Sequence, residues 1–315
     1  MRTVKRVALA LGVLVLAGLV YRIGIDAVLE AIHRLTWWRL VVVCVPYALI
    51  MAVDTLGWRF AFARDGVPFT SLFGARVVGE AINIVTVMGE IGEGFKAWLL
   101  RRDVSYQESV PSVVIAKTTI TVAQALFLLV GIVLAWTTLD VGPDVLHGMV
   151  WLFTIEVVAV AGLLGAQLSG LLARAGALLR IMGIDESHAK TLDASLRHYY
   201  RHQWRRCALS ICFHLLGWAL GALEAVVIFW ALRLDASLTT ATVIEALGSG
   251  VRFAAFLVPA SLGALESANA AAFASLGLGA GAGFAFTLVR RAREVVWVVI
   301  GVAGLFAMRS TSRRA

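Results

Sequence analysis

The chain has little charge and few cysteines, and it lacks the common motifs of soluble enzymes. Only 15% of its 315 residues are charged, against about 25% in a soluble domain, whereas 60% are hydrophobic. Its three cysteines form no C-x-x-C pair, which argues against a disulfide framework or a zinc site. There is no Walker A lysine motif, no G-x-S-x-G and no H-E-x-x-H, and the glycines of GEIGEG do not have the dinucleotide-binding order. These absences exclude a soluble catalytic domain and predict no cofactor.

The apolar residues gather in runs near the ~20 residues that a helix needs to cross a bilayer core. Lipid offers no partner to bare backbone N–H and C=O groups, so such runs must be helical. The sequence therefore predicts a single all-α polytopic membrane domain over residues 1–315, with about six full transmembrane helices. The first run follows basic residues but precedes no A-x-A-like cleavage site, so we expect it to be kept as a helix. The six runs are residues 7–21, 39–56, 112–136, 145–168, 207–232 and 281–308.

Two further segments, residues 71–102 and 241–278, are apolar on average but interrupted by Gly, Pro, Asn, Ser and charge. We interpret both as re-entrant or broken helical hairpins, one in a first half of about residues 1–140 and one in a second half of about residues 207–315. The two segments have a similar design, although the sequence shows no demonstrable repeat. This similarity favours two pseudo-inverted halves with a transport site between the breaks. We assign the breaks to Gly89, Gly92, Gly94, Pro259 and Gly263.

The helix that follows each break is expected to begin with free N–H donors and partial positive charge. Such helix N-termini favour an anionic group, for example a lipid phosphate. The interruptions thus predict where the chain turns, and they also predict that the protein binds an anionic headgroup.

Lys and Arg in the loops set the orientation, because cytoplasmic loops carry an excess of both. Their distribution predicts that both termini are cytoplasmic, and it explains the net charge of +8 without nucleic acid. The basic loop of residues 171–206 contains LRHYYRHQWRR, which is either a helix lying on an anionic leaflet or an ordinary cytoplasmic loop. His198 and His202 have helical spacing, but no third ligand is near, so no metal site is predicted.

Thirteen ionisable residues fall within the membrane-embedded segments. Each costs about 2.5–3.5 kcal/mol at the centre of a lipid-exposed helix, whereas a domain's net stability is about 5–15 kcal/mol. Most must therefore pair with one another, face a watered cavity or lie near headgroups. They are Arg76, Lys96, Lys117, Arg252, Arg290, Arg291, Arg293, Glu80, Glu90, Glu93, Glu245, Glu266 and Glu294.

From these segments we predict substrate-binding residues, with a purely structural polar core as the alternative. For the arginines of residues 290–293, a position at the membrane surface is a second alternative. The single charges Lys117, Glu156 and Glu224 are weaker candidates for ligands than for internal pairing partners, and of the three only Lys117 is kept among the substrate-binding residues. The predicted substrate-binding residues are Glu80, Asn83, Glu90, Glu93, Lys96, Lys117, Arg252, Glu266, Arg290, Arg291 and Glu294.

Three short motifs carry a family resemblance. The first is Asn83, then Gly92-Glu93, then Lys96; the second is Pro259, Leu262-Gly263 and Glu266; the third is the pair Arg290 and Arg291. With AKTTITVAQALFLLVG at residues 116–131, the chain resembles the transmembrane domain of lysylphosphatidylglycerol synthases and its stand-alone bacterial relatives, most of all the HpnL-like hopanoid-associated membrane proteins. It departs from the family in NIVTVMGEIG, which has no Pro in the first break.

The resemblance implies translocation of lipids across the bacterial inner membrane, so the expected function is that of a lipid flippase and not of an enzyme. The expected partners are membrane lipids with an anionic headgroup or of the hopanoid type, and a homo-oligomer is left open. Two other functions stay open: a non-catalytic accessory subunit of a lipid biosynthesis system, and an intramembrane enzyme using Glu90 and Glu93. Residues 1–315 contain no counterpart of the family's aminoacyl-transferring domain, so lipid aminoacylation is not implied.

Overall fold

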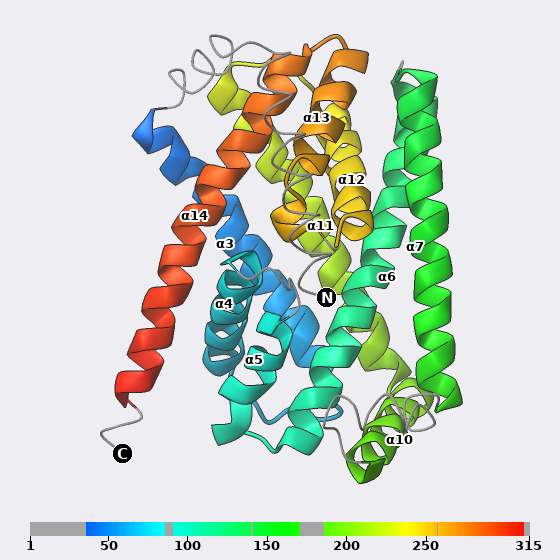
Figure 1. The fold of residues 1–315 in the computed structure, drawn as a ribbon, viewed down its shortest axis with the longest axis vertical. Helices are drawn as coiled ribbons and strands as arrows, with labels where there is room; N and C mark the ends of the chain where they lie inside the picture. The colour runs from blue at the N-terminus through cyan, green and yellow to red at the C-terminus, as the bar shows by residue number, and fades with distance from the viewer. Residues whose placement is uncertain (1–35, 86–90, 140, 171–185, 257, 312–315) are drawn as a thin grey trace.

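The computed structural model describes residues 36–85, 91–139, 141–170, 186–256 and 258–311. All secondary structure within these ranges is helical. The expected first transmembrane helix at residues 7–21 and the residues Gly89 and Glu90 lie outside the described residues. The helices form an elongated bundle in which α6 is central and α7 flanks it (Figure 1).

Four helices in the described part are long and apolar enough to cross a membrane. They are α3 (Trp37–Phe60), α6 (Tyr106–Thr138), α7 (Pro143–Ser169) and α11 (Trp204–Leu232), and they contain four of the six expected spans. Most of the apolar window in α7 is exposed, including Trp151 and Val158. A soluble protein would bury such a surface, so the chain is a multi-pass all-α membrane protein.

The number of spans expected from the sequence is not confirmed. The last expected span corresponds to α14 (Ala280–Thr311), which is 32 residues long but carries the arginine-rich stretch in its first half. Those side chains face the interior of the bundle, where carboxylates of other helices meet them, as shown below. The length of the apolar run is therefore not enough to identify α14 as a simple membrane span.

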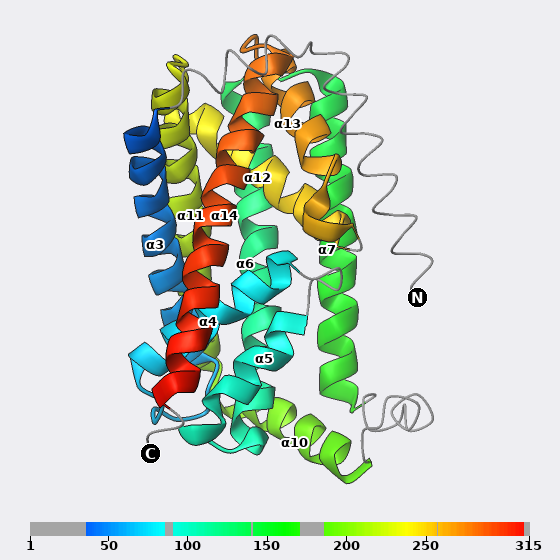
Figure 2. The same ribbon diagram turned by 60° about the vertical axis from the view of Figure 1, so that its left-hand side comes forward.

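Each of the two predicted interrupted segments contains two longer helices, and in the first segment the residues between them, 86–90, lie outside the described residues. Re-entry of these segments into the membrane is not confirmed. The first comprises α4 (Phe69–Val85) and α5 (Ile91–Leu99), followed by the short helix η1 (Leu100–Arg102). The second comprises α12 (Leu238–Ala254), the 3-10 turn η2 (Pro259–Ser261) and α13 (Ala264–Ser275). Figures 1 and 2 show α4 and α5 in the lower half of the bundle and α12 and α13 in the upper half, so the two helix pairs occupy opposite halves of the bundle.

Two of the glycines assigned to the first break lie in a helix, and one of them, Gly92, serves packing. Gly92 and Gly94 lie inside α5, so the expectation that they interrupt the helix is wrong. A Cβ atom on Gly92 would overlap the carbonyl oxygen of Gly79, which shows that α4 and α5 touch through their backbones here. Small residues allow this close approach between membrane helices. Gly283 has the same role where α14 meets the backbone of Asn269 in α13.

The predicted basic loop contains a helix, α10 (Glu186–His202), which lies across the lower end of the bundle (Figure 2). Its aromatic residues face the protein rather than a leaflet. Tyr199 is buried and donates a hydrogen bond to the carbonyl oxygen of Phe60 at 2.8 Å, and Tyr200 donates to Gln167 at 2.7 Å. Burial raises the pKa of Tyr200 to about 12, so its hydroxyl remains a donor at neutral pH.

Candidate functional site

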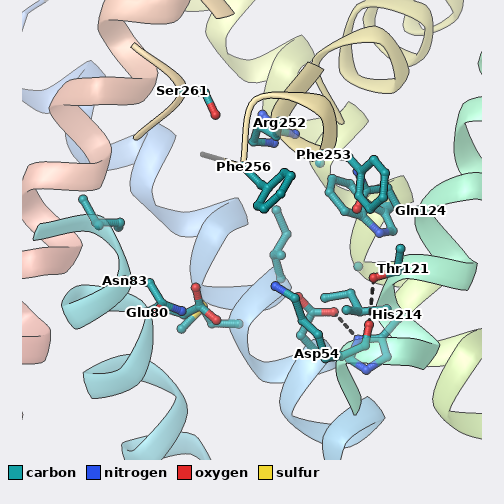
Figure 3. A pocket seen from close by; sticks show the side chains of 18 of the residues that line it. Asp54, Glu80, Asn83, Thr121, Gln124, His214, Arg252, Phe253, Phe256 and Ser261 are labelled. Carbon is teal, nitrogen blue, oxygen red and sulfur yellow. Dashed lines mark hydrogen bonds and ion pairs between the residues drawn. The ribbon is translucent and has the colours of Figure 1, made fainter. Parts of the chain in front are cut away.

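A cavity of about 840 Å³ lies between the helix pair α4 and α5 and the helix pair α12 and α13. Nine of the described helices contribute to its wall, namely α3 to α7 and α11 to α14, together with the interruption after α12. Asn83 and Glu80 lie on one side of it, Arg252 and Phe256 on another, and Asp54 with His214 at its lower edge (Figure 3). The lining is therefore mixed, with charged groups set among apolar side chains.

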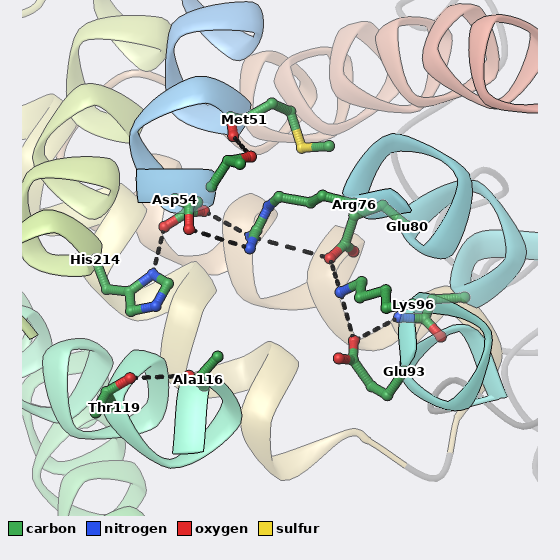
Figure 4. A network of polar contacts seen from close by, with 11 residues as sticks. Met51, Asp54, Arg76, Glu80, Glu93, Lys96, Ala116, Thr119 and His214 are labelled. Atoms are coloured by element: carbon green, nitrogen blue, oxygen red, sulfur yellow. Dashed lines mark hydrogen bonds and ion pairs between the residues drawn. The ribbon is translucent and has the colours of Figure 1, made fainter. Parts of the chain in front are cut away.

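One charged group, the lysine cluster, consists of Asp54, Arg76, Glu80, Glu93 and Lys96 (Figure 4). The Lys96 ammonium lies 2.7 Å from the carboxylate of Glu80 and 2.7 Å from that of Glu93. Arg76 lies 2.9 Å from Asp54 and 3.9 Å from Glu80. The charges thus form one chain from α3 through α4 to α5, as expected for embedded charges that pair with one another.

His214 of α11 extends the lysine cluster. Its Nδ1 lies 2.7 Å from the Asp54 carboxylate, and the imidazole is fully buried. Two glycines make room for this pair. A Cβ atom on Gly57 would come within 2.7 Å of the imidazole, and one on Gly217 within 2.7 Å of the Asp54 carboxylate.

A second charged group, the arginine cluster, surrounds the first half of α14 and comprises eight residues. Arg290 pairs with Glu245, and it lies 3.6 Å from Glu224. Arg293 lies 3.1 Å from Glu224. The other members complete the set with ion pairs of 2.8 to 3.1 Å. The members are Glu224, Glu245, Arg252, Glu266, Arg290, Arg291, Arg293 and Glu294.

The interruption before α13 is strained and is held by Glu266. Ala260 and Ser261 have φ values of 49° and 50°, a conformation that residues other than glycine rarely adopt. Gly263 follows with φ 78° and donates its backbone N–H to Glu266 at 2.8 Å, while the other oxygen of Glu266 accepts from Arg291. Glu266 is therefore buried behind the break, and it is not among the residues that line the cavity.

The expectation of free N–H donors after each break needs correction. The N–H of Gly92, near the start of α5, donates to the side chain of Asn83 at 2.7 Å. The N–H of Gly263, before α13, donates to Glu266. The protein's own side chains satisfy these groups, so side-chain cations are the better candidates for holding an anion.

Pairing accounts for most of the embedded charge. Of the thirteen embedded ionisable residues, eleven form ion pairs within 4 Å, Glu90 lies outside the described residues, and Lys117 lines the cavity. Burial of Arg290 and Arg293 argues against a place at the membrane surface. Glu224 is a pairing partner as expected, whereas the buried carboxylate of Glu156 has no hydrogen-bond partner within the described ranges, so that prediction is wrong for Glu156.

The sequence-based site omits several members of the two clusters. Arg76, Glu245 and Arg293 were recognised as embedded charges but not assigned to the site, and Asp54 and His214 were missed. The available signal is a polar residue within a largely apolar span, at residue 54 and again at residue 214. His198 and His202 stack on α10, and the described residues hold no cluster of three or more metal-ligand side chains.

The fold and the site together define a multi-pass α-helical membrane protein with a charged internal cavity between two interrupted helical segments. Residues 6–303 match the family described as the lysylphosphatidylglycerol synthase TM region, and the chain belongs to that family. The resemblance to this family is thereby confirmed, and it relates the protein to lipid handling, whereas the HpnL-like subtype is not confirmed. Comparisons with curated proteins and with solved structures found no match.

Proposed function

We propose that the protein is a lipid flippase that moves a polar or anionic headgroup through the cavity while the acyl chains stay in the bilayer. One observation carries the proposal: a cavity with charged walls lies between the helix pair α4 and α5 and the helix pair α12 and α13, which occupy opposite halves of an apolar bundle. Interrupted helices in two opposed halves are typical of transporter sites. A headgroup that enters the cavity leaves water but contacts fixed charges of the protein, so it does not have to contact hydrocarbon.

The size of the cavity suits this role. Small-molecule sites typically enclose about 300–1,000 Å³, and 840 Å³ accommodates a headgroup without its acyl chains. The apolar members of the lining, such as Ile120, Leu163 and Phe253, suit the start of those chains. The proposal needs no catalytic residue, and because the sequence holds no ATP-binding motif, transport is passive or coupled to an ion.

Exposure separates the residues that can touch a headgroup from those that support them. The side chains of five ion-paired residues in the lining are 18–33% exposed: Glu80, Glu93, Arg252, Arg291 and Glu294. Asp54, Arg76, Lys96, Arg290 and Arg293 are 5–10% exposed. We assign the first group to headgroup contact and the second to positioning.

We also propose that this membrane is the bacterial inner membrane, with both termini on the cytoplasmic side. The proposal rests on the basic residues at the end of the bundle where α10 lies. Arg59, Arg64, Arg101 and Arg102 belong to the turns and helix ends of that side, and the positive-inside rule makes it cytoplasmic.

The test is reconstitution of the purified protein into vesicles with a fluorescent phospholipid, followed by chemical quenching of the outer leaflet. We expect rapid loss of the protected fraction with the wild type and at least tenfold slower loss with Arg252→Ala or Arg291→Ala. Arg101→Ala is the matched control, because Arg101 is exposed and stacks on Trp98 away from the cavity. Wild-type vesicles no faster than protein-free vesicles would reject the proposal and favour an accessory subunit.

A further inference from the structure

We propose that His214 and Asp54 form a proton-binding site linked to headgroup binding, so that a proton and an anionic headgroup occupy the protein together. This inference rests on the proposed function for its substrate, and it adds a coupling ion. It starts from a buried imidazole that faces the cavity and that the described contacts satisfy on one side only.

The geometry of His214 leaves one position for a proton. Its Nδ1 is hydrogen-bonded to Asp54, which places a proton on that nitrogen if Asp54 is ionised. Its Nε2 is buried and has no hydrogen-bond partner in the described part of the chain. Imidazole is a side chain that can gain and lose a proton, and in this arrangement Nε2 is the atom that would accept it.

The carboxylate of Asp54 is shared between two cationic partners. One oxygen meets His214 and the other meets Arg76 at 2.9 Å. A proton on His214 turns the first contact into a full ion pair, which weakens the hold of Asp54 on Arg76. Arg76 already lies 3.9 Å from Glu80, so positive charge becomes available at the cavity wall.

A single proton on His214 changes the net charge of the site from zero to +1. The described residues of the two clusters, with Lys117, contain seven carboxylates and seven Lys or Arg side chains. This set is neutral when His214 is neutral, and it carries +1 when His214 is protonated. A phosphodiester carries −1, so the protonated site matches it and the neutral site does not.

Other charges around His214 act in both directions. Asp54 favours the proton, whereas Arg76 and Lys96 oppose it. The other charges that act on His214 lie across the cavity, on helices packed against α11 and on α11 itself. Helix α10 also packs against α11 but adds no charged side chain to the described lining of the cavity. The residues that carry these other charges are Lys117 on α6, Glu245 and Arg252 on α12, Arg290 and Arg293 on α14, and Glu224 on α11.

Linkage makes the effect reciprocal: if an anionic headgroup raises proton affinity, a proton raises headgroup affinity by the same factor. We expect wild-type protein in detergent to bind dihexanoyl phosphatidylglycerol about tenfold more tightly at pH 5.5 than at pH 8. Calorimetry in two buffers of different ionisation enthalpy should show net proton uptake on binding at pH 7. Dihexanoyl phosphatidylcholine, which carries no net charge, should cause little uptake.

The decisive variant is His214→Asn, whose amide can still donate to Asp54 from the position of Nδ1 but cannot titrate. We expect it to lose the proton uptake and the pH dependence. His202→Asn, on the exposed face of α10, is the matched control and should keep both. If His214→Asn does not fold, as judged by gel filtration, His214→Gln takes its place, and nitrogen-15 NMR of wild-type histidines must show a resonance whose midpoint moves with the anionic lipid.

Equal proton uptake in His214→Asn and wild type would overturn the inference, as would absence of uptake in the wild type or of any histidine resonance that moves. If the wild type takes up protons with the lipid but translocates nothing in vesicles, the proton site stands and the flippase function fails. The calorimetry and the vesicle assay therefore separate the two.

Discussion

The lysine cluster and the arginine cluster face the same cavity but are built from different chemistry. The arginine cluster surrounds four guanidinium groups, which keep their charge at any pH that a protein meets. The lysine cluster has one arginine, one lysine and an adjoining imidazole, with carboxylates shared between them. The first is a permanently charged scaffold, and the second can change its charge.

This difference has a consequence for what each cluster tolerates. When Glu224 is lost from the arginine cluster, guanidinium groups stay charged and buried. When Lys96 is lost from the lysine cluster, the carboxylates left behind can bind a proton, which removes part of the penalty. Stability should therefore depend on pH after the loss of Lys96 and not after the loss of Glu224.

The largest effect is expected for Glu224→Leu in the arginine cluster. This change removes the carboxylate 3.1 Å from Arg293 and 3.6 Å from Arg290. Breaking a buried pair from one side typically costs about 3–5 kcal/mol, so the unfolding temperature in detergent should fall by many degrees, equally at pH 5 and pH 8. Glu108→Gln is the control, because its partner Arg64 is exposed and such pairs contribute about 0–1 kcal/mol.

Lys96→Met tests the lysine cluster in the same way. It leaves Glu80 and Glu93 without the ammonium at 2.7 Å from each, and an unsatisfied buried group costs about 1–3 kcal/mol. The carboxylates can bind protons, so the loss of thermal stability should be clear at pH 8 and smaller at pH 5. Identical losses at the two pH values would remove the proposed distinction between the clusters.

The existence of these clusters is partly predictable from the sequence, and their membership is not. The energetic cost of embedded charge correctly predicts that the ionisable residues pair with one another. It does not name the partners, because Asp54 and His214 lie 160 positions apart and each looks like a lone polar residue in an apolar helix. Only the packing of α3 against α11 brings them together.

Glycine shows the same limit in the backbone. Gly263 does lie at a break, where its positive φ suits a residue without a Cβ atom. Gly92 lies within a helix and is needed for contact with α4. A glycine in the sequence indicates that a side chain is not tolerated. It does not distinguish a turn from a close contact between helices, because both require glycine.

Replacing the packing glycines compares how tightly the two halves are built. A Cβ atom on Gly92 would overlap the backbone of α4, and one on Gly283 would overlap the backbone of α13. Overpacking typically costs about 1–3 kcal/mol, so Gly92→Ala and Gly283→Ala should both lower the unfolding temperature. Gly165→Ala on α7 meets open space and should not. A loss confined to one variant would show that only one hairpin depends on close backbone contact.

The smallest effect is expected at Asp65, an exposed reference for both clusters. Arg206 donates a hydrogen bond to it at 3.0 Å, and this holds the pKa of Asp65 below its usual value. A lowered pKa means that the pair stabilises the fold above the unfolded pKa of about 3.9, and that this contribution is lost as the pH falls through the folded value. Because Asp65 is 57% exposed, Asp65→Asn should cost no more than about 0.5 kcal/mol at pH 7 and nothing near pH 2, measured by thermal unfolding. A cost at Asp65 as large as that of Lys96→Met would mean that burial does not set the strength of the charge pairs, and the contrast between the clusters would then need another explanation.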